Sequence, residues 1–170
     1  MQEKKSLIIY KELLKKYNKV LHLTSKNANL NELISQSIYI QKFIKENSVI
    51  MDVGSGGGIV GIPLKIVRND LKVYLVERSE KKCTFLEIAI KQLNLKDVFV
   101  INQDYKNVNF NFKFDYILAR ALGNYEELLK HLKKFLNESG SFIIFSDVEI
   151  EGFKIKKEKI KNLTITLISL

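Results

Sequence analysis

The sequence Val49-Ile50-Met51-Asp52-Val53-Gly54-Ser55-Gly56-Gly57-Gly58 decides the fold of this chain. It begins as a short apolar run, carries one acid near the end of that run, and continues into four glycines within five positions. Glycine costs backbone entropy, so glycines gather where φ must be positive or where another molecule approaches the backbone closely. The stretch therefore predicts a buried strand over 49–53, followed by a turn that holds a phosphate or a nucleoside.

Strands that alternate with helices are predicted after this stretch. Near-continuous apolar runs such as Val73-Tyr74-Leu75-Val76 and Tyr116-Ile117-Leu118 are typical of strands buried on both faces. Short connections between alternating strands and helices indicate an α/β fold with a doubly wound parallel sheet. The expected strands are 49–53, 72–77, 98–102, 114–118 and 141–146, and the expected helices are 60–69, 80–93 and 124–137, with Asn94 and Gly140 at helix ends.

The two ends of the chain flank this core. Apolar residues at helical spacing predict amphipathic helices over 3–17 and about 30–45. Near the C-terminus, 164–168 predicts a strand that pairs antiparallel at the end of the sheet, whereas 153–161 leaves an exposed strand and a lysine-rich helical turn both open. We expect a single domain over 1–170, with an N-terminal helical appendage at 1–47 and a cofactor-binding α/β core at 48–170.

Composition narrows the class of protein. The chain has a net charge of +9, which indicates an acidic partner such as nucleic acid. A nucleotide bias of the genome, which would also explain the many Lys, Asn and Ile residues, accounts for the charge equally well. The single Cys83 forms no internal disulfide, and with only His22 and His131 beside it no zinc-ligand spacing exists, so we expect no metal. Neither a long apolar run nor a secretion signal is present, so we expect a soluble cytoplasmic protein without a membrane partner.

Two glycine patterns overlap in the turn. Residues 56–61 match the dinucleotide pattern G-x-G-x-x-G, with Glu77 about twenty residues further on. Residues 52–58 match D/E-x-G-x-G-x-G, the pattern of S-adenosylmethionine-dependent methyltransferases. The first glycine belongs at the end of the strand, where Gly54 lies, and Asp52 would repel a pyrophosphate but suits a zwitterionic methionine end and its sulfonium. The register therefore favours S-adenosylmethionine, with Gly54, Gly56 and Gly58 in the loop.

Acidic residues near the ends of the next two strands are candidates to bind the ribose and the adenine of the donor. Glu77 ends the second strand and is placed to accept both ribose hydroxyls, the alternative being an ion pair with Arg78 or Lys81. Asp104 follows the third strand, where it would accept the adenine amino group or cap a helical turn. Alternatively, the backbone of Tyr105 and Lys106 would bind the adenine.

The acceptor is constrained by what the sequence lacks. Pro63 is the only proline, so no N-P-P-Y motif can position an exocyclic amine, and Cys83 has no Pro-Cys context for covalent attack on a pyrimidine. Neither a carboxylate nor a histidine occupies a general-base position after the fourth strand. A nucleophile without a proton, such as N7 of guanine, needs no catalytic residue, because alignment alone then carries the reaction.

Several motifs together resemble ribosomal RNA small-subunit methyltransferase G, also called GidB, over residues 14–146. The matching residues are Tyr17-Asn18-Lys19-Val20, Leu23-Thr24, Asp52 to Gly58, Gly61-Ile62-Pro63-Leu64, Glu77, Lys82, Phe85-Leu86 and Ala119-Arg120-Ala121. The resemblance implies a Rossmann-like S-adenosylmethionine-dependent methyltransferase sheet with two N-terminal helices. It also implies N7 methylation of one guanosine in 16S rRNA, in the free RNA or the 30S subunit. Cofactor contacts are implied at Gly54, Ile59, Tyr105, Lys106 and Arg120, the alternative role of Arg120 being a salt bridge to Asp52 or Asp115.

The chain departs from the family pattern on its substrate side. Val60 stands where a proline is usual, Ser35 to Tyr39 lack the usual His followed by Asp-Ser, and Phe145-Ser146-Asp147 replaces a Leu-Lys-Gly turn. A methyltransferase acting on a small molecule or protein, and a non-catalytic cofactor- or ribosome-binding relative, therefore remain alternatives. We expect a monomer whose RNA footprint is formed by Lys4, Lys5, Lys15, Lys16, Lys19 and the lysines of 154–161.

Overall fold

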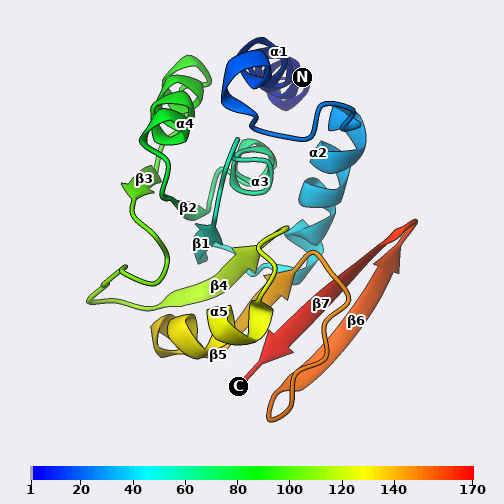
Figure 1. The fold of residues 1–170 in the computed structure, drawn as a ribbon, viewed down its shortest axis with the longest axis vertical. Helices are drawn as coiled ribbons and strands as arrows, with labels where there is room; N and C mark the ends of the chain where they lie inside the picture. The colour runs from blue at the N-terminus through cyan, green and yellow to red at the C-terminus, as the bar shows by residue number, and fades with distance from the viewer. Residues whose placement is uncertain (1) are drawn as a thin grey trace.

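Seven strands form one sheet in the order β3-β2-β1-β4-β5-β7-β6 in the computed structural model, which describes residues 2–170 (Figure 1). The strands β1 to β5 run parallel, β7 pairs antiparallel with β5, and β6 pairs antiparallel with β7 at the outer edge. The strands are β1 (Val49–Val53), β2 (Lys72–Glu77), β3 (Val98–Asn102), β4 (Phe114–Ala119), β5 (Leu136–Ile144), β6 (Lys154–Ile160) and β7 (Leu163–Ser169). The α/β sheet expected from the sequence is thus confirmed.

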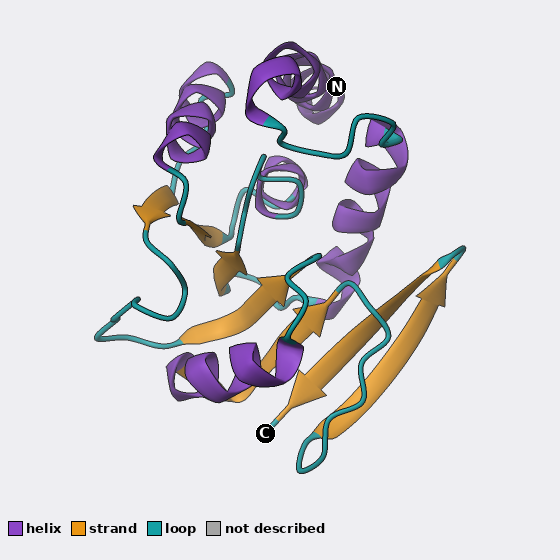
Figure 2. Ribbon diagram, in the orientation of Figure 1, coloured by secondary structure: helices purple, strands orange, loops and turns teal. Residues whose placement is uncertain are grey.

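Helices cover the two faces of this sheet unequally (Figure 2). Four helices, α1 (Gln2–Leu21), α2 (Leu30–Tyr39), α3 (Gly61–Val67) and α4 (Glu80–Gln92), lie on one face with the short 3-10 helix η1 (Ile40–Phe43). The other face carries α5 (Tyr125–Leu132) and the 3-10 helix η2 (Lys133–Phe135). Beside α5, this face is covered by the loop between β3 and β4, which contains no helix. The Phe110 ring of this loop packs on the sheet, with its centre 5.0 Å from that of Phe114 and 5.9 Å from that of Tyr74.

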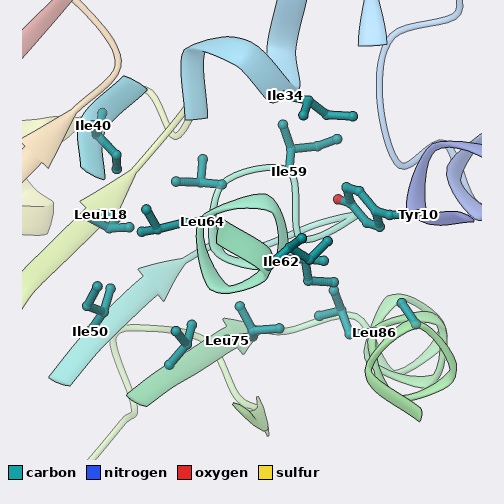
Figure 3. Packing of buried hydrophobic residues seen from close by; sticks show 14 of the residues in the cluster. Tyr10, Ile34, Ile40, Ile50, Ile59, Ile62, Leu64, Leu75, Leu86 and Leu118 are labelled. Carbon is teal, nitrogen blue, oxygen red and sulfur yellow. The ribbon is translucent and has the colours of Figure 1, made fainter. Parts of the chain in front are cut away.

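The N-terminal helix α1 packs directly onto the glycine loop. Tyr10 is fully buried, and its hydroxyl donates a hydrogen bond to the Gly57 carbonyl oxygen at 2.7 Å. Figure 3 shows Tyr10 beside Ile59 and Ile62, on the side of α3 that faces α1. The helix therefore belongs to the same hydrophobic core as the strands.

The start of the fifth strand differs from the prediction. The helix expected over 124–137 ends at Leu132, and β5 begins at Leu136 instead of 141. Gly140, expected to end the helix, lies inside β5, where a Cβ atom would be 2.8 Å from the Asp115 carbonyl oxygen. The register between β4 and β5 shifts at this point, and glycine permits the close approach of the two backbones.

The C-terminal region forms a hairpin. The expected antiparallel strand is confirmed as β7, which pairs with β5 from Ser141↔Ser169 to Ile144↔Thr166. The lysine-rich helical turn is wrong, because Lys154–Ile160 is the strand β6. β6 pairs with β7 along its full length, which provides hydrogen-bond partners for its backbone. Local propensity alone does not distinguish this strand from a helical turn. Likewise the helix expected over about 30–45 ends at Tyr39 and continues as η1.

Candidate functional site

A cavity of about 690 Å³ opens at the carboxyl ends of β1, β2 and β4. In doubly wound sheets this edge, where the strand order reverses, is where ligands bind. The lining comes from the glycine loop, from 76–78, 103–105 and 120–122 after the neighbouring strands, and from 23–28 in the N-terminal segment. Of the residues predicted for the site, the cavity brings together Asp52, Gly54, Gly56, Ile59, Glu77, Asp104, Tyr105 and Arg120.

Gly58 and Lys106 lie outside that lining. Gly58 has φ +71°, and a Cβ atom there would approach Ile62 to 2.6 Å and Leu86 to 2.9 Å, so its position is determined by packing below the loop. The ammonium group of Lys106 donates to Glu127 on α5 at 2.6 Å. Gly54 lies at the end of β1 with φ +64° and is exposed in the cavity, where a Cβ atom would be 2.4 Å from the Leu122 side chain.

Glu77 is held by the backbone of the glycine loop. Its carboxylate oxygens accept from the Gly56 N–H and the Ser79 N–H, each at 2.9 Å, and the residue is only 7% exposed. The alternative ion pair with Arg78 does not form, because Arg78 faces Asp104 at 3.8 Å. Each carboxylate oxygen keeps a free lone pair, so the side chain can still accept hydrogen bonds from a ligand.

Asp104 adopts the capping role that the sequence left open. Its Oδ1 accepts from the Lys106 N–H at 3.0 Å, and its carbonyl oxygen accepts from the Asn107 N–H at 2.9 Å. These bonds fold 104–107 into a turn after β3. Tyr105 lines the cavity from this turn. Partial burial of its side chain raises the pKa of the Tyr105 hydroxyl.

Asp52 lies beneath the glycine loop and is only 2% exposed. Its Oδ2 accepts from the Gly61 N–H at 3.0 Å, at the start of α3. Burial raises the pKa of this carboxyl to about 7, the neighbouring Glu77 carboxylate acts in the same direction, and the bond from Gly61 opposes the shift. A cation in the cavity would favour the charged form of Asp52.

Arg120 supplies the opposite charge from the end of β4. Its Nη2 donates to the Gln36 side-chain oxygen at 2.7 Å, and the guanidinium lies over the Phe145 ring, 5.1 Å from its centre. Burial lowers the pKa of the Arg120 guanidinium. Within residues 2–170, its Nη1 is the only buried side-chain nitrogen or oxygen without a hydrogen-bond partner. Such an atom calls for an acceptor from a ligand.

The expected alternative role of Arg120 is not seen in the structure. The Asp115 carboxylate accepts from the Val49 N–H at 2.8 Å and from the Asn137 side chain at 2.7 Å. The described part of the chain contains no ion pair between Arg120 and any carboxylate. The contact with Gln36 was not predicted, because the two residues are 84 positions apart.

The segment 23–28 is the other part of the site that was not predicted as lining. Asn18 positions it, since its Oδ1 accepts from the Thr24 N–H at 2.8 Å. Leu23 packs on the glycine loop, where a Cβ atom added to Gly57 would be 3.0 Å from the Leu23 Cβ. The signal was present in the motif Y-N-x-x-x-x-L-T, whose structural role is to fasten this segment against the loop.

Comparison with known proteins identifies the family. The family model described as "GidB: rRNA small subunit methyltransferase G" matches residues 3–166. The chain belongs to the GidB family. A GidB-family protein of Aquifex aeolicus, named ribosomal RNA small subunit methyltransferase G, is 34% identical over 189 residues, which cover 99% of this chain and 85% of that protein. The protein of the same name from Oenococcus oeni is 32% identical over 154 residues, which cover 84% of this chain.

Two further facts set the scope of the GidB comparison. The chain spans 63% of the length of the Oenococcus oeni relative. Among solved structures, a point mutant of MtNAS in complex with S-adenosylmethionine superposes with a TM-score of 0.68 at 16% identity, covering 99% of this chain and 71% of that one. This likeness supports the fold alone.

No helix within residues 2–170 is both long and apolar enough to cross a membrane.

Proposed function

We propose that this chain transfers a methyl group from S-adenosylmethionine to N7 of a guanosine in 16S rRNA. The observation that carries the proposal is Arg120, whose buried Nη1 lacks a partner and whose side chain lines the same cavity as the glycine loop and Glu77. Membership of the GidB family supports the rRNA substrate. The partner is then 16S rRNA or the small ribosomal subunit, which places the reaction in the cytoplasm. The cavity is lined both by residues of the segment 1–47 and by residues of the α/β core, which supports a single domain over 1–170.

The residues of the cavity fit this methyl donor by charge. Arg120 offers its unpaired donor to the methionine carboxylate, and Asp52 offers a buried carboxyl to the cationic sulfonium and ammonium groups. Glu77 retains lone pairs for the ribose hydroxyls. The exposed Gly54 allows the donor to approach the backbone, since it carries no side chain. The turn at 104–107 borders the remaining part of the cavity, where the adenine would bind.

Proximity and alignment are sufficient for the chemistry at N7. The guanine N7 carries a lone pair and no proton, so the new bond to the methyl carbon forms as the carbon–sulfur bond breaks, and no base is required. The donor supplies an activated methyl group on a good thioether leaving group. Neither histidine nor cysteine is among the described residues that line the cavity. The protein's contribution is to hold donor and acceptor in line.

The proposed activity is tested by methyl transfer to small subunits from cells that lack the endogenous methyltransferase. We expect one 7-methylguanosine per 16S rRNA after incubation with S-adenosylmethionine, detected by mass spectrometry of nuclease-digested RNA. The Arg120→Met protein serves as the control, because it should keep the fold and bind the donor more weakly. Failure of the unmodified protein to methylate the RNA while it binds the donor would refute the proposal and favour a small-molecule, protein or non-catalytic role.

The raised pKa of Asp52 predicts that binding of the donor depends on pH. The unfolded pKa is near 3.8 and the folded pKa about 7, so the ligand-free folded protein holds an extra proton between these values and loses stability as pH rises through them. A bound cation favours the ionised carboxylate and expels that proton. We therefore expect affinity for S-adenosylmethionine to rise from pH 5 to about 7, by at most about tenfold per pH unit, and then to level off.

Titration calorimetry over this pH range measures the effect. The matched variant Asp52→Asn keeps an acceptor for the Gly61 N–H and removes the titrating group. Its affinity should vary little between pH 5 and 7. An Asp52→Asn protein with the same pH dependence as the unmodified chain would assign the effect to another group.

A further inference from the structure

A second cavity, of about 760 Å³, lies between the C-terminal half of α1, the segment 22–29 and the start of α2. We call it the lysine groove, because Lys11, Lys15, Lys19 and Lys26 all line it. The first three are spaced four residues apart on α1, so they form a row on one side of the helix at intervals of about 6 Å. A row of evenly spaced cations suits a polymer of anions better than a single ion.

The charge of the lysine groove is largely uncompensated. No aspartate or glutamate is among its lining residues. Lys15 pairs with Glu12 at 2.9 Å, but both side chains are more than half exposed, so this pair contributes little. Within residues 2–170, Lys19 and Lys26 form no ion pair. The groove therefore presents a positive potential that attracts phosphates and releases their counterions.

The start of α2 adds to this potential. Asn29 caps the helix, since its side chain accepts from the Glu32 N–H at 3.2 Å, and Leu30 and Asn31 line the groove. The amino end of a helix carries partial positive charge. Lys11 donates to the Asn31 side chain at 3.2 Å, which places the α1 lysine row beside the start of α2. The amide side chains offer neutral donors and acceptors for sugar hydroxyls.

The lysine groove adjoins the cavity of the proposed methyl donor. Thr24, Ser25 and Ala28 line both cavities, so one short segment forms the wall between them. That segment is fixed by the Asn18 bond to the Thr24 N–H. A strand whose phosphates lie in the groove is therefore separated from the donor cavity by this segment alone.

We propose that the lysine groove binds phosphates of the RNA strand that carries the target guanosine, and so delivers the base over Thr24 to Ala28 to the methyl donor. This inference rests on the proposed function. It changes the expected footprint, because Lys15 and Lys19 line the groove together with Lys11 and Lys26. The lysines of 154–161 lie instead on β6, at the outer edge of the sheet, and in the turn that follows it. The groove then acts on acceptor binding and leaves donor binding unchanged.

The test compares two triple variants of equal charge. The first changes the exposed groove residues by Lys15→Gln, Lys19→Gln and Lys26→Gln, and the second changes exposed lysines elsewhere by Lys91→Gln, Lys96→Gln and Lys113→Gln. Small subunits lacking the mark are the substrate, and S-adenosylmethionine binding is measured separately by calorimetry. We expect the groove variant to raise KM for the subunits about tenfold, and to lower the slope of log affinity against log salt by about 2, with donor affinity unchanged.

The control variant should retain KM and most of the salt slope. Equal KM values for the two variants would overturn the inference while transfer by the unmodified protein still supports the proposed function. Loss of affinity for polyglutamate, with unchanged KM for the subunits, would assign the groove to an acidic protein and also overturn it. Absence of transfer by the unmodified protein would contradict the proposed function itself, and the inference that rests on it.

Discussion

Arg120→Met should weaken S-adenosylmethionine binding by about 2 kcal/mol, or roughly thirtyfold in Kd, because a charge-assisted hydrogen bond to the ligand is lost. The same change should leave the Tm of the ligand-free protein nearly unchanged, because two effects oppose each other. Loss of the Nη2 bond to Gln36 destabilises the fold, and removal of Nη1, which is buried without a partner, relieves a desolvation cost. Titration calorimetry and thermal unfolding measure the two effects separately.

Arg68 provides the matched control for Arg120. Its guanidinium is fully engaged within the protein, with two bonds to the Asp70 carboxylate at 2.8 and 2.7 Å and one to the Ile44 carbonyl oxygen at 3.0 Å. Arg68→Met should therefore lower the Tm and leave donor affinity intact. If Arg120→Met instead lowers the Tm and keeps the Kd, Arg120 is a structural residue and the proposed site is wrong.

Gly58→Ala should destabilise the fold by about 2–5 kcal/mol. A φ of +71° costs an alanine about 1–2 kcal/mol, and the clash with Ile62 and Leu86 adds about 1–3 kcal/mol of overpacking. For a chain of 170 residues this corresponds to a fall in Tm of roughly 10 °C. Thermal unfolding followed by circular dichroism measures it.

Gly152→Ala separates the two causes. Gly152 has φ +82°, but no atom lies within 4 Å of a Cβ added there, so only the backbone strain applies. We expect a loss of about 1–2 kcal/mol for this variant. Equal losses at positions 58 and 152 would mean that the packing of the glycine loop on α3 and α4 contributes nothing.

Local sequence was sufficient to predict most of the sheet. The central strands are continuous apolar runs between turn residues, and such runs are expected to form buried strands whichever strands they pair with. The start of β5 was missed because Lys133 to Asn137 continue a helical pattern, and only the backbone of β4 decides the register at Gly140. The strand β6 was left open because its pairing with β7 is a tertiary choice.

The predicted parts of the site all lie at the carboxyl ends of strands or in the segments that follow them. Glycines and acids at strand ends can be recognised in the sequence. Since the carboxyl ends of parallel strands lie at one edge of the sheet, these residues are expected to come together there. The N-terminal contributions were less visible. Nothing local to Gln36 indicates that it meets Arg120, and the contact arises only when α2 packs beside the sheet. The lysine groove likewise needs α1 and α2 to meet, although Lys15 and Lys19 were among the residues expected to bind RNA.

The bond from Tyr10 to Gly57 has a consequence for the order of folding. It closes a loop of 47 residues, so it joins α1 to a turn that is synthesised later. Contacts of such separation form after local ones, because their closure entropy must be offset by structure already in place. The glycine loop therefore reaches its final form only when α1 docks on it, which makes binding of the methyl donor a reporter of completed folding.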